Sequence, residues 1–190
     1  MKVLFVGNSF TYCNNLPTLF QNMAKAINPD IKVDKLTFGN HYLRQYADFD
    51  GEKGKLFLEK LNEDHWDFVI LQEQSFNPVK DYDDFFTAAK KLCVEIRKNG
   101  AQPILYQTWA YRDQSEHLKR KGVSYDEMYL KLENAYQTAA AQLDTVAVPV
   151  GRAFYHITKN CANVNLLKDD DCHPSLEGSL VAASLFLKLL

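Results

Sequence analysis

The chain has 190 residues, of which 46% are hydrophobic and 24% are charged, and its net charge is −2. This length and composition suit one soluble globular domain over residues 1–190, and the charge balance gives no sign of a nucleic-acid partner. No run of ~20 apolar residues could span a membrane and Met1–Gly7 is not a signal peptide, so we expect a cytoplasmic protein unless a leader has been removed.

The first half of the chain alternates between strand and helix patterns. Lys2–Gly7 is a short β-branched and aromatic run that predicts a strand, and apolar residues at helical spacing follow over 16–27. Residues 31–37 predict a second strand, and residues 56–61 predict a helix within a less regular region. Residues 67–73 predict a third strand that is apolar on both faces at its centre, as expected for a sheet covered on both sides.

The second half continues this alternation. A helical stripe over 85–96 precedes a predicted strand over 102–108. A charged and polar segment then predicts a surface excursion or surface helix at 111–124. Another helical stripe over 128–143 leads into the last predicted strand, and a closing helix follows. These final two elements cover residues 145–150 and 176–190.

Strands that alternate with helices pair in parallel through right-handed crossovers, so we expect an α/β fold. The architecture would be a three-layer α/β/α sandwich with about five parallel strands. In such open sheets, ligands bind beyond the carboxyl ends of the strands. The loops after Gly7, Thr37, Glu73 and Thr108 are therefore the expected places for functional residues.

A candidate nucleophile lies directly after the first predicted strand, in the segment Gly7-Asn8-Ser9-Phe10-Thr11. Gly7 permits a sharp turn, which places Ser9 at the carboxyl end of the strand. Backbone N–H groups are free near such a turn, and they suit an oxygen that develops negative charge. The alternative is a Gly-Asn-Ser turn chosen only for its turn chemistry.

A second candidate segment lies near the C-terminus, where Asp170 and His173 are three residues apart. One turn of chain could bring the carboxylate to the imidazole, fix its tautomer and leave the other nitrogen to accept a serine proton. Pro174 favours an extended His173 and suits the first position of a helix. The alternative is a solvated acidic loop with a surface histidine.

On these two motifs, the chain resembles the SGNH hydrolases, a variant of the GDSL esterases, from residue 3 to the C-terminus. The resemblance implies a flavodoxin-like strand order 2-1-3-4-5, Ser9 as nucleophile, and Asp170 and His173 as its partners. The family's second block is a glycine after the second strand, which Gly39 matches. Ser9 and Gly39 would then supply two backbone donors to the oxyanion. The resemblance implies no metal or organic cofactor.

The third block departs from the family pattern. The family usually has G-x-N-D after the third strand, with the asparagine side chain as third oxyanion donor. Here the sequence reads LQEQSFNP over residues 71–78, so the carboxamide would come from Gln74, at the end of the strand, or from Asn77. The chain resembles a subgroup with G-N-S-F-T, L-Q-E-Q-S and T-W-A segments. We expect Gln74 to be the donor.

The expected function is hydrolysis of a small acyl ester, with an acetyl group on a carbohydrate favoured by analogy with the family. A thioesterase or lysophospholipase-type activity on longer acyl chains is the second possibility. A non-catalytic small-molecule-binding module on a flavodoxin-like sheet is the third. Among other residues near the expected site, Trp109 and Tyr111 would line the pocket or pack in the core, and Tyr12 and Asn14 would border the site.

Overall fold

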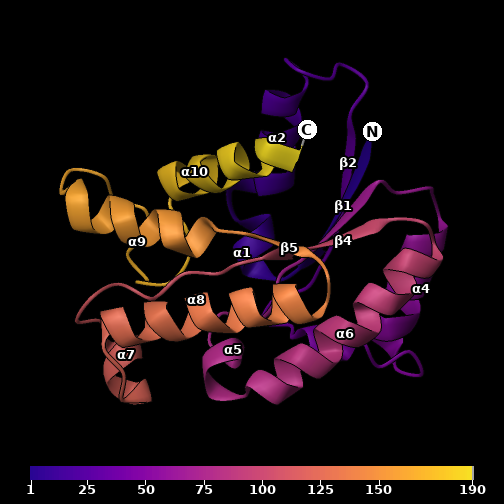
Figure 1. Ribbon diagram of the computed structural model, residues 1–190. Helices are drawn as coiled ribbons and strands as arrows, with labels where there is room; N and C mark the ends of the chain where they lie inside the picture. The colour runs from indigo at the N-terminus through magenta and orange to yellow at the C-terminus, as the bar shows by residue number, and fades with distance from the viewer. Residues whose placement is uncertain (190) are drawn as a thin grey trace.

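A parallel sheet forms the centre of the computed structural model, which describes residues 1–189. Its strands are β1 (Lys2–Gly7), β2 (Lys32–Thr37), β3 (Phe68–Leu71), β4 (Gln102–Tyr106) and β5 (Val146–Val148). All neighbours pair in parallel, in the order β2-β1-β3-β4-β5 (Figure 1). The α/β class and the strand order 2-1-3-4-5 are therefore confirmed.

Helices cover both faces of this sheet (Figure 1). The longer helices on one side are α2 (Leu16–Ala24), α9 (Val150–Asn160) and α10 (Leu176–Phe186). Those on the other side are α4 (Glu52–Asn62), α6 (Tyr82–Lys98) and α8 (Tyr125–Gln142). Short helical turns connect these elements: α1 (Ser9–Tyr12), η1 (Cys13–Asn15), α3 (Leu43–Tyr46), α5 (Asn77–Lys80), α7 (Glu116–Lys121) and η2 (Leu187–Leu189).

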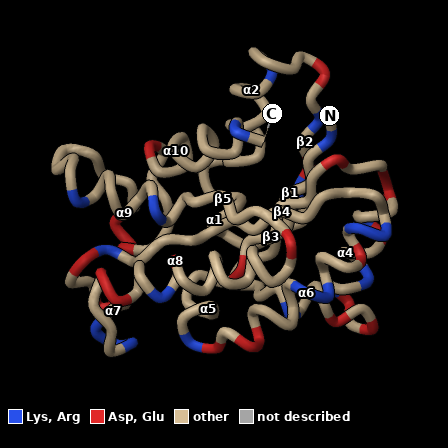
Figure 2. The backbone as a smooth tube through the Cα atoms, in the orientation of Figure 1, with Lys and Arg blue, Asp and Glu red and all other residues tan. Residues whose placement is uncertain are grey.

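The core lies between the sheet and each helical layer, and aromatic side chains make much of it. Phe5 of β1 packs edge-on against Phe20 of α2 and Phe186 of α10, with ring centroids 5.7 and 5.2 Å apart. On the opposite face, Phe85 of α6 packs against Tyr136 of α8 at 5.0 Å. Lys, Arg, Asp and Glu lie mainly on the outer helices and loops (Figure 2). No helix among residues 1–189 combines the length and the apolar character needed to cross a membrane.

Two central strands end earlier than the sequence predicts. The prediction of strands over 67–73 and 102–108 was too long, because β3 ends at Leu71 and β4 at Tyr106. Gln72 and Gln107 each donate one more backbone hydrogen bond to a neighbouring strand, and the chain then leaves the sheet. The polar residues that follow are consequently free to approach the loops at the carboxyl edge.

Helix α9 was not predicted from the sequence, and the last predicted strand was too long. Residues 145–150 were expected to form a strand, whereas β5 ends at Val148 and α9 begins at Val150. Pro149 cannot donate to a strand ladder and suits the start of a helix. A Cβ atom on Gly151 would lie 2.1 Å from the Thr108 carbonyl oxygen, so this glycine lets α9 approach the end of β4.

The closing helix ends earlier than expected, because α10 ends at Phe186 and a 3-10 turn covers Leu187–Leu189. Residue 190 of the expected helix lies outside the described residues. The polar excursion predicted for 111–124 contains the short helix α7, which Ser115 caps at its N-terminus and Gly122 caps at its C-terminus.

Candidate active site

The turn after β1 fixes the backbone around Ser9. A Cβ atom on Gly7 would lie 2.6 Å from both Gln72 Oε1 and Thr11 Oγ1, so only glycine fits this position. Asn8 then caps α1, since its side-chain oxygen accepts a hydrogen bond from the Phe10 N–H at 3.1 Å. Ser9 is the first residue of that helix, and an N–H in this position has no acceptor within the helix.

The structure brings Ser9, His173 and Asp170 together from opposite ends of the chain. His173 Nε2 lies 2.8 Å from Ser9 Oγ, and His173 Nδ1 lies 2.8 Å from Asp170 Oδ2. An ionised carboxylate only accepts hydrogen bonds, so it places the imidazole proton on Nδ1. Nε2 is then left with a lone pair directed at the serine hydroxyl, as proton transfer from serine requires.

Asp170 is held ionised by its own loop. Partial burial opposes its charge, but the N–H groups of His173 and Cys172, at 2.8 and 3.1 Å from Oδ1, outweigh that effect. Together with the imidazole, they lower the pKa of Asp170 to about 2. Asp171 has other partners, since its carboxylate pairs with Arg112 Nε at 2.5 Å. Within the acidic stretch 169–171, Asp170 is therefore the residue that contacts the imidazole.

Ser9 and His173 line a cavity of about 300 Å³. The other lining residues are Asn8, Phe10, Asn40, Gln74, Ser75, Tyr111, His117, Lys121 and Cys172. None of these is a carboxylate. The volume is at the lower end of the range for small-molecule sites, which suits a compact ligand.

Trp109 and Tyr111, the two aromatic residues expected after the fourth strand, lie in different environments. Trp109 is buried, stacks on Phe10 at 4.5 Å and on Phe154 at 4.4 Å, and lies beneath the site. Tyr111 lines the cavity, and its hydroxyl lies 2.6 Å from Ser75 Oγ. Trp109 is thus a packing residue, whereas Tyr111 belongs to the wall of the cavity.

Tyr12 and Asn14 take different places at the border of the site. The Tyr12 hydroxyl lies 3.3 Å from where a Cβ atom on Gly39 would be, beside the loop after β2. Asn14 donates hydrogen bonds of 2.9 Å to the carbonyl oxygens of Pro174 and Ser175. Asn14 therefore tethers the segment that follows His173 and does not line the cavity.

The segment after β3 forms buried hydrogen bonds with the loops after β1 and β2. Gln72 Oε1 accepts hydrogen bonds from the Asn8 N–H at 2.9 Å and from Thr11 Oγ1 at 2.8 Å. Glu73 Oε1 accepts from the Leu43 N–H at 3.2 Å and from the Gln74 N–H at 2.5 Å. Gln72 thereby braces the Ser9 turn, and Glu73 joins the loop after β2 to the loop after β3.

Of the two candidate carboxamides, Gln74 lies at the cavity and Asn77 does not. The Phe76 N–H donates to Gln74 Oε1 at 2.9 Å, which fixes the orientation of the amide. Asn77 is 3% exposed, and its amide nitrogen donates to Asp84 at 2.8 Å. Gly39 follows β2 and is adjacent to Asn40, which lines the cavity in a left-handed conformation with φ of 56°.

One group of potential metal ligands exists within residues 1–189, formed by Asp170, Cys172 and His173. Its donor atoms have other partners, because the imidazole nitrogens already contact Asp170 and Ser9. Burial and the neighbouring Asp170 raise the pKa of Cys172 to about 12, so its thiol stays protonated at neutral pH. A protonated thiol is a poor metal ligand, and this donor set does not favour a metal.

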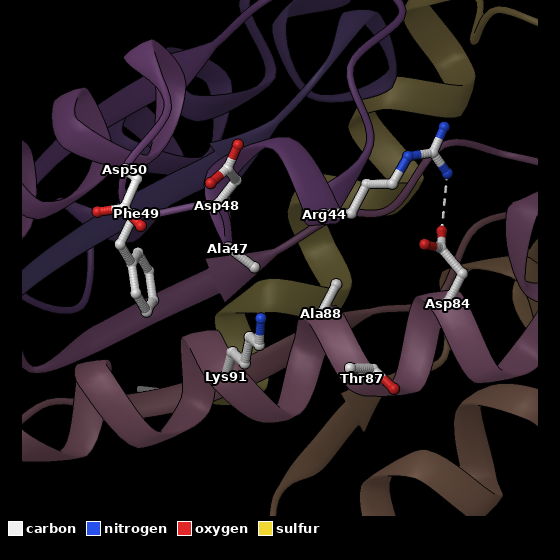
Figure 3. A pocket seen from close by; sticks show the side chains of 9 residues that line it. All are labelled: Arg44, Ala47, Asp48, Phe49, Asp50, Asp84, Thr87, Ala88 and Lys91. Atoms are coloured by element: carbon white, nitrogen blue, oxygen red, sulfur yellow. Dashed lines mark hydrogen bonds and ion pairs between the residues drawn. The ribbon is translucent and has the colours of Figure 1, made fainter.

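A second cavity, of about 420 Å³ (Figure 3), shares no lining residue with the cavity beside Ser9. One wall comes from α6, with Asp84, Ala88 and Lys91, and the facing wall includes Arg44 and Asp48. Arg44 and Asp84 form an ion pair at 2.7 Å across its edge. No serine, cysteine or histidine is among its lining residues, in contrast to the cavity that Ser9 and His173 line.

Sequence reasoning assigned no role to Gln72, Arg112, His117 and Lys121, although each contacts the site or its loops. Gln72 was visible as a polar residue in an apolar strand segment, and a buried polar side chain there signals a hydrogen-bonding task. Arg112, His117 and Lys121 lie in the polar excursion, whose path over the site depends on tertiary contacts.

The chain matches no family model and no curated protein. Among solved structures, it is similar to a candidate SGNH hydrolase from Slackia heliotrinireducens at 29% identity, with a TM-score of 0.87 and 99% and 97% of the two chains covered. A DUF4886 family protein from Bacteroides uniformis has 21% identity and a TM-score of 0.78, over 100% of this chain and 82% of that one. An acetyl xylan esterase has 17% identity and a TM-score of 0.72, with both chains fully covered. The last two share the fold.

The buried Glu73 carboxyl generates a prediction about stability. Burial raises the pKa of Glu73 to about 7, although the N–H groups of Gln74 and Leu43 partly offset it. In the unfolded chain this group ionises near pH ~4.3. Between these values the unfolded state releases a proton that the folded state keeps, so the free energy of unfolding falls as pH rises.

Glu73→Gln removes this titration and should gain stability relative to the wild type as pH rises from 5 to 8, by up to about 3 kcal/mol. Urea unfolding of both proteins at several pH values measures the difference, and other titrating groups cancel because both proteins contain them. Parallel pH profiles for the two proteins would contradict the raised pKa of Glu73.

Proposed function

Because the chain belongs to the SGNH/GDSL superfamily of ester hydrolases, we propose that it removes a small acyl group, favouring acetyl, from an alcohol such as a carbohydrate hydroxyl. The observation that carries this proposal is the pair of 2.8 Å contacts that link Ser9 Oγ to His173 and His173 to Asp170. We assign Ser9 as nucleophile, His173 as general base and acid, and Asp170 as the group that orients His173.

In the proposed reaction, Ser9 Oγ attacks the ester carbonyl carbon while its proton passes to His173 Nε2. The tetrahedral intermediate collapses by breaking the bond to the alcohol oxygen, which receives the proton from His173. The acyl group is then attached to Ser9. Water attacks this acyl-enzyme with His173 again as base, releasing the carboxylic acid and restoring the serine.

The proposed oxyanion donors come from three neighbouring loops. Ser9 N–H has no acceptor within its helix, and Gly39 lies in the loop after β2. Gln74 would supply the third donor through its amide nitrogen, since Phe76 N–H already holds its oxygen. Preorganised donors of this kind stabilise the charge that develops in the transition state.

Two features support a small acyl group over a long one. The cavity beside Ser9 is about 300 Å³, which leaves little room for an extended acyl chain together with the alcohol. One protein with the same fold is an acetyl xylan esterase. Comparison of acetyl and octanoyl p-nitrophenyl esters tests this choice, and a preference for octanoyl would favour the thioesterase or lysophospholipase alternative.

Replacing the assigned residues should abolish turnover. Ser9→Ala and His173→Ala should each lower kcat for p-nitrophenyl acetate by ~10⁴-fold or more, because the three residues act as a unit. Asp170→Asn should cost somewhat less, because it upsets the tautomer and leaves the base in place. Steady-state kinetic assays on the folded variants measure these kcat values. A larger loss in Asp171→Asn than in Asp170→Asn would refute the assignment of the acid.

Covalent labelling by a fluorophosphonate provides an independent readout, because the probe reacts with an activated serine. Wild type should be labelled and Ser9→Ala should not. Absence of labelling in the wild type would favour a non-catalytic binding module on this sheet over an esterase.

Gln74→Ala should lower kcat by roughly 10²–10³ with little change in KM, the usual cost of removing one oxyanion donor. Asn77→Ala is the matched control, since it also deletes a carboxamide from the same loop but its amide contacts Asp84. It should do less. Equal kinetics for wild type and Gln74→Ala would mean that Gln74 only bonds to the loop backbone.

A further inference from the structure

The segment that follows β4 forms several hydrogen bonds with the loop that carries Asp170 and His173. Three side chains of this segment, those of Trp109, Arg112 and His117, donate hydrogen bonds to that loop. The accepting carbonyl oxygens belong to Leu167, Lys168, Asp170 and Cys172, and the Arg112 N–H donates to a fifth, that of Asp171. Five carbonyl groups between residues 167 and 172 therefore accept hydrogen bonds from one neighbouring segment.

Arg112 makes most of these contacts. Its Nη2 donates to the Leu167 and Lys168 carbonyl oxygens at 3.0 and 2.9 Å. Its Nη1 donates to Asn165 Oδ1 at 3.2 Å, and its Nε to Asp171 Oδ1 at 2.5 Å. A guanidinium has five N–H donors in a fixed plane, so one side chain can hold several acceptors in a set geometry.

The loop combines these contacts from the neighbouring segment with hydrogen bonds of its own. It closes on itself through the Lys168 N–H to His173 carbonyl bond at 2.8 Å and the Ser175 N–H to Leu166 carbonyl bond at 2.9 Å. Between these closing bonds, Asp171 adopts a left-handed conformation with φ of 63°, which is unfavourable for most residues with a side chain. The Arg112 bonds to both the carboxylate and the carbonyl of Asp171 hold it in this conformation.

We propose that Arg112 is a positioning residue, which holds the loop so that the imidazole of His173 meets the Ser9 hydroxyl. This inference rests on the proposed function of Ser9 and His173. Ser9 belongs to the turn after β1, whereas Asp170 and His173 belong to the loop before α10. Their alignment therefore requires this loop to be fixed relative to the sheet. Arg112 provides that link, because its segment continues directly from β4.

The effect should appear in turnover more than in stability. Displacement of catalytic groups by about 1 Å can cost ~10²-fold in rate, whereas a half-exposed ion pair contributes little to folding. We therefore expect Arg112→Met to lower kcat for p-nitrophenyl acetate by ~10²-fold with KM changed less than ~3-fold. Arg112→Lys keeps the charge with fewer directed donors and should lose roughly 10-fold.

Arg152 offers a matched control. It is also an arginine paired with a carboxylate, with its Nε 2.8 Å from Glu133 Oε1, and its side chain is 46% exposed against 39% for Arg112. Arg152→Met should keep wild-type kcat. Asp171→Asn provides a milder test, since asparagine tolerates the left-handed conformation and only the ion pair is lost. It should lower kcat by less than Arg112→Met does.

Chemical rescue separates positioning from general damage. Millimolar guanidinium should restore part of the kcat of Arg112→Ala, because the small cation can occupy the vacated site. It should leave Arg152→Ala unchanged. Retention of wild-type kcat by Arg112→Met would overturn the inference. The inference would also be overturned if guanidinium failed to restore the kcat of Arg112→Ala while thermal unfolding showed that this variant is folded.

If Arg112→Met or Arg112→Ala does not fold, Arg112→Lys and Asp171→Asn decide the matter, and wild-type kcat in both would overturn the inference. Failure of the proposed function gives a different result, in which wild type and Ser9→Ala hydrolyse the ester at the same rate. An active, Ser9-dependent wild type with an unaffected Arg112→Met would reject the role of Arg112 alone.

Discussion

The absence of a side chain at residue 7 is the constraint on which the rest of the site depends. The chain must leave β1 and turn at once into α1, and the Gln72 amide and the Thr11 hydroxyl occupy the space where a Cβ atom would be. These same groups form the hydrogen bonds that fix the turn, and the Tyr46 hydroxyl donates to the Gly7 carbonyl at 2.7 Å. The position of Ser9 is therefore set by buried polar contacts and not by a flexible loop.

Parallel pairing then decides what can reach Ser9. Gly7 pairs with Thr37 of β2, and Val6 pairs with Leu71 of β3, so the loops after these three strands emerge side by side. The same edge receives the loop before α10, which contributes Asp170 and His173. Two carboxyl groups near this edge have opposite titration behaviour. Donors around Asp170 lower its pKa to about 2, whereas burial raises that of Glu73 to about 7. Asp170 can thus pair with an imidazole at neutral pH, while Glu73 serves as a buried link between loops.

The features that sequence predicts well here are those encoded by local pattern. Alternating apolar segments predicted the strands and the longer helices other than α9, and Pro174 with the Asp170–His173 spacing marked the second motif. Helix α9 was missed because its start depends on Pro149 ending β5 and on the close approach of Gly151 to β4. Arg112 could not be identified from sequence, because its partners lie more than fifty residues away and two of the four acceptors of its side chain are backbone carbonyl groups, which have no sequence signature.

The departure of the third block from G-x-N-D has a physical explanation, because Gln72, Glu73 and Gln74 each make different contacts. Gln72 points under the Ser9 turn, Glu73 joins two loops from a fully buried position, and Gln74 reaches the cavity. A glycine in place of Gln72 would leave the Asn8 N–H and the Thr11 hydroxyl without their buried acceptor, which is costly. Replacement of Gln72 alone by glycine would therefore disturb the turn that carries Ser9. The side chain that supports the Ser9 turn and the side chain proposed as third oxyanion donor belong to one hydrogen-bonded segment.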